Sequence, residues 1–77
     1  MQVTVELQTY LGQYSPNGQP LFECTLSEGA TVQALVRQLN VPEELAGVIV
    51  LNERIADFPE RLHEGDRVTL IPPLAGG

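Results

Sequence analysis

Only one stretch of this sequence carries the spacing of an amphipathic helix, and this restricts the fold more than any other feature. The stretch begins after Thr31, a residue suited to cap a helix, and stops at Asn40 and Pro42. A helix of about ten residues is weak on its own, so its apolar stripe must be buried against other elements. The stripe follows the spacing i, i+3, i+4 and i+7 and consists of Val32, Leu35, Val36 and Leu39.

Strand patterns lie on both sides of this helix. Residues 1–8 alternate apolar and polar side chains, which predicts a strand with one buried face. The turn formers of residues 15–18 predict that the first two strands form a hairpin with a long loop. A tight turn at 64–66 precedes the last strand, which ends at a Pro-Pro pair. The other predicted strands are 21–26, 48–51, 54–56 and 67–71.

The order strand, strand, helix, strand, strand, strand predicts an α+β fold of the β-grasp (ubiquitin-like) type. In this roll one main helix packs across a mixed sheet of four to five strands. The crossover through the helix places the first and last strands side by side in the middle. The chain of 77 residues is short enough for one domain. We therefore expect a single β-grasp domain over residues 1–77, with a flexible C-terminal tail at 74–77.

The charges and apolar runs exclude several classes of partner. The net charge is −6, lysine is absent, and the four arginines are spread singly along the chain. Nucleic-acid binding needs clustered basic residues, so we expect no nucleic-acid partner. No apolar run approaches the length of a membrane span and no signal-peptide pattern opens the chain. We expect a cytoplasmic protein without a membrane partner.

The residues that most often carry chemistry are scarce. Cys24 is the single cysteine, which excludes an internal disulfide, and its apolar surroundings predict a buried structural thiol. His63 is the single histidine and stands in a turn beside Glu64, which favours a solvated side chain. Metal sites need clustered ligands, and none is spaced that way. We therefore expect no metal site, no cofactor bound by the chain itself and no enzymatic activity.

The C-terminal pair Gly76-Gly77 is the strongest functional signal. Two residues without a Cβ atom give a chain end its smallest cross-section and greatest backbone freedom. Such an end suits delivery of the terminal carboxylate into a narrow active site of another protein. The alternative is that the pair is incidental and ends an interaction domain.

Three stretches together resemble the ubiquitin-like sulfur carriers (the MoaD/ThiS type). These carriers include the small subunit of molybdopterin synthase and the thiamine-pathway carrier. The Pro72-Pro73 pair resembles the molybdopterin branch, whereas Glu53 stands where a glycine is common. The helix start at 29–32, followed by Leu35, is also similar to the family. The three stretches are Val50-Leu51-Asn52, the segment 62–68 and the segment 72–77.

The resemblance implies a non-catalytic subunit of a sulfurtransferase system. A ubiquitin-activating-type enzyme would adenylate the Gly77 carboxylate with ATP and magnesium. A persulfide donor would then convert it to a thiocarboxylate, with Gly76 and Ala75 giving the tail access to the partner's active site. The sulfur would go to molybdopterin on a larger catalytic subunit. The alternatives are a thiamine-pathway carrier and a ubiquitin-like modifier conjugated through Gly77.

The last predicted strand also points to a docking surface. Alternation turns Val68 and Leu70 inward and leaves Ile71 on the opposite face. A large apolar residue beside the reactive end predicts partner binding through the run Ile71, Pro72, Pro73 and Leu74. The alternative is that Ile71 packs under a neighbouring loop.

Overall fold

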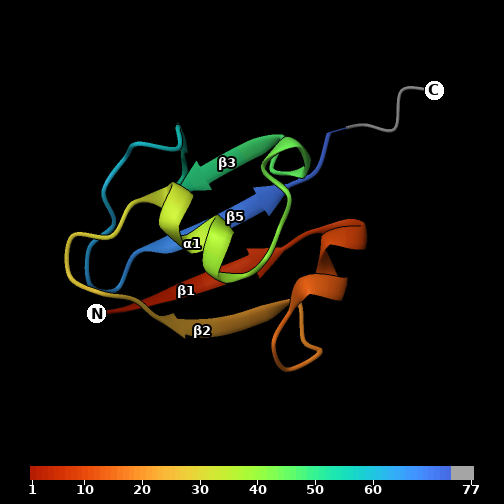
Figure 1. The fold of residues 1–77 in the computed structure, drawn as a ribbon, viewed down its shortest axis with the longest axis horizontal. Coiled ribbons are helices and arrows are strands. Elements are labelled where there is room, and N and C mark those ends of the chain that lie inside the picture. The colour runs from red at the N-terminus through yellow and green to blue at the C-terminus, as the bar shows by residue number, and fades with distance from the viewer. Residues whose placement is uncertain (74–77) are drawn as a thin grey trace.

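The computed structural model describes residues 1–73 and contains one mixed five-stranded sheet with one α-helix across it (Figure 1). Each predicted strand is present, with bounds that differ from the prediction by no more than a residue at either end. The 3-10 helices η1 and η2 lie in the connections before β2 and β3. The elements are β1 (Gln2–Leu7), η1 (Thr9–Tyr14), β2 (Leu21–Thr25), α1 (Val32–Gln38), η2 (Glu43–Leu45), β3 (Val48–Leu51), β4 (Arg54–Ala56) and β5 (Arg67–Ile71).

The sheet has the strand order β2-β1-β5-β3-β4. The first and last strands are parallel neighbours at its centre, with Val5 opposite Val68. β1 pairs with β2 and β3 pairs with β5 in antiparallel fashion, and β4 adds an edge next to β3. This arrangement confirms the predicted β-grasp fold with adjacent first and last strands.

α1 begins and ends through local hydrogen bonds. The backbone N–H of Ala34 donates to the Thr31 hydroxyl at 3.1 Å, which confirms the predicted cap. At the other end Val41 N–H donates to the Val36 carbonyl, and Asn40 has a φ of 62°. This Schellman-type ending stops the helix at Gln38, so α1 has seven residues and is shorter than predicted.

The core lies between α1 and one face of the sheet. Val32, Leu35 and Val36 of the helix are completely buried, and Val5, Val68 and Leu70 of the central strands meet them from the sheet side. The other sheet face carries no helix in the described part of the chain (Figure 1). The side chains on this open face are therefore candidates for partner binding.

The loop between β1 and β2 is more ordered than its turn formers predict. It contains η1, whose Leu11 is completely buried and joins the core. A short 3-10 helix spans too few residues to leave a periodic pattern, which explains why the sequence did not reveal it. Within residues 1–73, no helix is long and apolar enough to cross a membrane.

Candidate functional site

The predicted reactive end lies outside the part of the chain that the structure describes. Leu74, Ala75, Gly76 and Gly77 belong to this end, and their predicted roles stay predictions. The described part of the candidate site is the end of β5, together with the open sheet face beside it.

β5 has the predicted alternation. Val68 and Leu70 are completely buried on the helix side, whereas Ile71 lies on the open face. Ile71 is half-buried because Val48 of β3 stands directly opposite it in the antiparallel register. The neighbouring strand β3 therefore flanks Ile71 on the open face.

An apolar patch surrounds Ile71 on the open face. Val48 is 38% exposed and Ile55 is 72% exposed, while Val50 is half-buried between them. Val48 faces Ile71 across the strands, and Val50 faces Ile55, so the four side chains are neighbours on one surface. We call Val48, Val50, Ile55 and Ile71 the open-face patch. An exposed group of apolar side chains of this kind is typical of a protein-binding surface.

The alternation of β5 predicted Ile71, whereas the other three members of this patch were not predicted. The signal was the continuous apolar run of β3, in which every second residue must face away from the helix. The two prolines after Ile71 differ from each other. Pro73 is exposed, whereas Pro72 is buried, and the partner contacts predicted for both prolines stay predictions. The burial of Pro72 anchors the chain at the end of β5.

A shallow hollow of about 260 Å³ lies beside the patch. Its floor is the open face between β3 and β5. Arg67 at its border is held by Glu6 of β1, with 2.8 Å between Nη2 and Oε1. Such a hollow has the size and mixed polarity to receive side chains of a docked protein. Its lining residues are Val50, Asn52, Glu53, Arg67 and Thr69.

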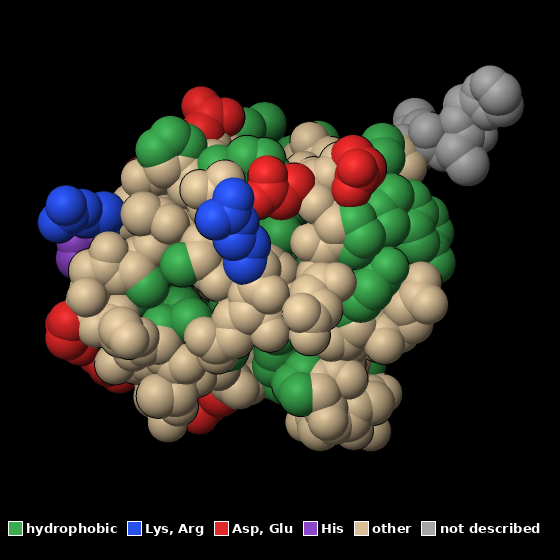
Figure 2. Space-filling model, in the orientation of Figure 1, with side chains coloured by type: hydrophobic (Ala, Val, Ile, Leu, Met, Phe, Trp, Pro, Cys, Tyr) green, Lys and Arg blue, Asp and Glu red, His purple; other side chains and the backbone are tan. Residues whose placement is uncertain are grey.

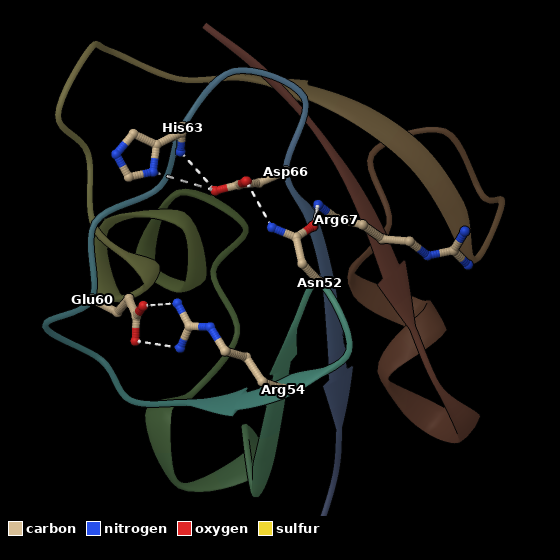
Figure 3. Close-up of polar contacts among 6 residues, drawn as sticks. All are labelled: Asn52, Arg54, Glu60, His63, Asp66 and Arg67. Carbon is tan, nitrogen blue, oxygen red and sulfur yellow. Dashed lines mark hydrogen bonds and ion pairs between the residues drawn. The ribbon is translucent and has the colours of Figure 1, made fainter.

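The turn between β3 and β4 forms one wall of this hollow. Asn52 and Glu53 have φ values of 51° and 80°, as a two-residue hairpin turn requires. The Asn52 side chain fixes the turn, since its Nδ2 donates to Asp66 Oδ1 at 2.8 Å and its Oδ1 accepts from the Arg67 N–H (Figure 3). The turn is thereby joined to the turn that precedes β5.

His63 lies in this second turn, with its side chain 80% exposed, which confirms the predicted solvated position. Its backbone N–H donates to Asp66 Oδ2 at 2.7 Å, and its imidazole lies 3.8 Å from the same carboxylate (Figure 3). The residue therefore acts in the turn mainly through its main chain. Within residues 1–73, no group of three or more His, Cys, Asp or Glu side chains is placed to hold a metal ion.

Cys24 is buried on the helix side of β2, as predicted. Burial raises the pKa of its thiol, and a hydrogen bond from Gln38 Nε2 at 3.4 Å opposes that rise more weakly. A raised pKa keeps the thiol protonated and unreactive. Cys24 is thus a structural residue.

The charges are spread over the surface and do not form a basic patch on the face that Figure 2 shows. Arg37, Arg54 and Arg67 each lie beside a glutamate, at Glu43, Glu60 and Glu6. In Figure 2, hydrophobic side chains gather on the side of the molecule where β5 ends.

Comparison with known proteins found a matching family and similar solved structures. The model of the ThiS family matches residues 9–77, whereas a search of the curated proteins found no match. The Pyrococcus furiosus protein assigned as subunit 1 of a molybdopterin converting factor is similar in structure. Its TM-score is 0.73 at 25% identity, over 95% of this chain and 98% of that one.

Two further solved structures are similar to this chain. One is the complex of subunits 1 and 2 of the molybdopterin-converting factor from Helicobacter pylori, with a TM-score of 0.62 at 25% identity over the full length of both chains. The other is the small archaeal modifier protein 1 of Haloferax volcanii. Its TM-score is 0.74 at 18% identity, over 95% of this chain and 98% of that one. The last likeness extends to the fold alone.

Proposed function

Because the chain belongs to the ThiS family of ubiquitin-like sulfur carriers, we propose that it carries sulfur as a thiocarboxylate on Gly77. The observation that carries the proposal is that the family match runs to residue 77 and includes Gly76-Gly77. Members of this family are carriers and not enzymes, so the catalytic groups belong to the partners. The chain must supply an accessible carboxylate and a surface that partners recognise.

The chemistry explains why the carrier needs an activating partner. A carboxylate is a poor electrophile, because the group that would leave is oxide. A ubiquitin-activating-type enzyme would use ATP and magnesium to form an acyl-adenylate on Gly77 and release pyrophosphate. The terminal sulfur of a persulfide would attack the carbonyl carbon and displace AMP. A second thiol would then cleave the sulfur–sulfur bond and leave the thiocarboxylate.

We propose molybdopterin synthesis as the destination of the sulfur, with a larger catalytic subunit as the acceptor. The support is the Pro72-Pro73 pair and the likeness to two molybdopterin-converting factor subunits at 25% identity, one of them in complex with its subunit 2. The open-face patch is the surface we assign to the activating enzyme and to the larger subunit. Its apolar side chains lie next to the end of β5 and so beside the start of the tail.

Two other functions have observations in their favour. The name of the matched family favours the thiamine pathway, in which the same thiocarboxylate would serve a different acceptor. The fold likeness to a small archaeal modifier favours conjugation, in which an amine would attack the activated Gly77 in place of a persulfide. All three functions share the activated carboxylate and differ in what receives it.

The first test is the intact mass of the protein purified from its own cells under mild non-reducing conditions. Replacement of one terminal oxygen by sulfur is expected, and fragmentation must place it on Gly77, because oxidation of Met1 or Cys24 changes the mass by nearly the same amount. A variant with one residue added after Gly77 is the control and should not be converted.

A reconstituted reaction decides the matter if the thiocarboxylate is lost during purification. The protein is incubated with the activating enzyme, ATP, magnesium and a persulfide donor. Conversion of Gly77 supports the carrier function, and an amide bond from Gly77 to lysines of other proteins would favour the modifier. Absence of both products would refute an activated tail.

A further inference from the structure

Gly47 is the residue immediately before β3, and it lies against the point where the chain leaves β5. In Figure 1 the connection that leads from η2 into β3 passes beside the end of β5. A Cβ atom at Gly47 would stand 2.6 Å from the backbone nitrogen of Pro73 and 3.0 Å from its Cα and Cδ. A distance of 2.6 Å is essentially never found for a real Cβ atom, so a side chain here requires the backbone at Gly47 or Pro73 to shift.

The close approach of Pro73 distinguishes Gly47 from the other described glycines. Gly18, Gly29 and Gly65 have positive φ values, which glycine adopts without strain, and a Cβ would meet nothing within 4 Å at any of them. Gly12 also has open space around it. Gly47 has no positive φ, so only space requires a glycine at this position.

The neighbours of Pro73 are held in place. Pro72 is buried, and Ile71 is paired with Val48, the residue that follows Gly47. Both prolines have a restricted φ, so the segment 71–73 is a stiff base for the residues that follow. This base rests on Gly47 on one side and is anchored through Pro72 beside it.

We propose that Gly47 is a positioning residue, which sets the direction in which the C-terminal tail leaves the sheet relative to the open-face patch. The proposal rests on the proposed function, in which a partner docks on that patch and receives the tail. Gly47 and Val48 are consecutive. One short segment therefore contacts Pro73 through Gly47 and forms an edge of the open-face patch through Val48. A partner docked on Val48 therefore meets residues 71–73 in a fixed position.

The test is Gly47→Ala, with Gly12→Ala as the matched control that adds the same methyl group in open space. Alanine at position 47 must push Pro73 from 2.6 Å to the 3.4 Å or more of ordinary contact. We expect the affinity for the activating enzyme to stay within about threefold. The rate of ATP–pyrophosphate exchange at saturation should fall about 10- to 100-fold, as for an ångström-scale misplacement of a reacting group. Gly12→Ala should leave both unchanged.

A double variant separates the tail direction from a general structural effect. In a Pro73→Gly background the chain can turn aside, so adding Gly47→Ala should lower the rate by less than about threefold. Equal losses in both backgrounds, or a loss confined to affinity, would assign Gly47 a merely structural role and overturn the proposal. An unchanged rate for Gly47→Ala would do the same.

A spectroscopic measurement tests the contact without any partner. In NMR spectra of the wild-type protein we expect nuclear Overhauser effects between the Gly47 α protons and the Pro73 ring. Gly47→Ala should shift resonances of residues 71–73 and leave those of β1 in place. If the activating enzyme fails to adenylate the wild-type protein, the proposed function fails. The spectra still decide whether Gly47 contacts Pro73. Absence of the Overhauser effects would refute the contact between Gly47 and Pro73, and with it the proposal.

Discussion

Glu53 occupies a backbone conformation that is unfavourable for a residue with a side chain. Its φ of 80° and the 51° of Asn52 form the two-residue turn between β3 and β4. Asparagine tolerates such angles, whereas glutamate at this position costs about 1 kcal/mol. The turn keeps its shape because Asn52 is hydrogen-bonded to Asp66 and Arg67.

We predict that Glu53→Gly stabilises the protein by up to about 1 kcal/mol. Relief of the backbone strain outweighs the greater freedom of glycine in the unfolded chain. Urea unfolding followed by circular dichroism measures the change. Glu53→Gln is the control, since it removes the charge and keeps the strained angle, and should change stability by less than about 0.5 kcal/mol. Equal stability of the glycine variant and the wild type would argue against strain.

Glu60 contributes to the loss of the protein's stability as the solution becomes acidic. A hydrogen bond from Arg54 lowers the pKa of the Glu60 carboxyl below its ordinary 4.5, and the nearby charge of Arg54 lowers it further. In the folded protein Glu60 therefore holds its proton less tightly than in the unfolded chain. The resulting stability is present above pH 4.5 and is lost as the pH falls through the lower, folded-state pKa.

We therefore predict that Glu60→Gln flattens the dependence of unfolding free energy on pH in the acid range. The effect is small because the pair lies at the surface. Arg54→Gln is the matched control, because it removes the partner that lowers the pKa and should flatten the same range. Denaturant unfolding at a series of pH values tests both. Parallel pH profiles for the wild type and both variants would contradict the assignment.

At the scale of elements, the surface that we propose for recognition is the open face of β3, β4 and β5, where the open-face patch lies. Val48 and Ile71 form a cross-strand pair at the end of the sheet from which the tail departs. Leu21 of β2 is 49% exposed on the same face but stands across from Glu6, and β1 and β5 separate its strand from β3. The sheet thus offers an apolar residue outside the patch for comparison.

We predict that Val48→Glu and Ile71→Glu each weaken binding to the activating enzyme at least about tenfold, as buried charges at the centre of an interface do. Leu21→Glu should change the affinity less than about twofold. Isothermal titration calorimetry gives the affinities, and circular dichroism checks that each variant is folded. If Leu21→Glu were as damaging as Ile71→Glu, recognition would depend on overall charge and not on the patch.

Elements with a periodic pattern could be predicted from the sequence, and elements defined by local capping could not. The alternation of β1 and β5 predicted both strands and their buried residues. η1 left no pattern, and α1 ended earlier than its apolar stripe because the left-handed Asn40 closed it. Hydrophobic periodicity reports which face is buried, whereas the last turn of a helix depends on single residues.

At the scale of the whole molecule, the candidate site depends on contacts between distant segments. Ile71 could be found from the sequence because it alternates with Val68 and Leu70. The pairing of Val48 with Ile71 and the contact of Gly47 with Pro73 each join segments more than twenty residues apart. A periodic pattern carries no information on strand register between such segments. The sequence therefore indicated one edge of the site, and the sheet topology supplied the rest.

The central position of β5 also determines how the protein bears force. β5 is hydrogen-bonded to β1 on one side and to β3 on the other, and the chain continues from its end towards Gly77. Traction along this end, as a partner draws the terminal residues into a narrow channel, would load the hydrogen bonds of both ladders together in shear. If an edge strand such as β4 were peeled from its single neighbour, its hydrogen bonds would break one at a time. The chain end that the proposed partner would draw in thus continues from a strand that is hydrogen-bonded on both sides.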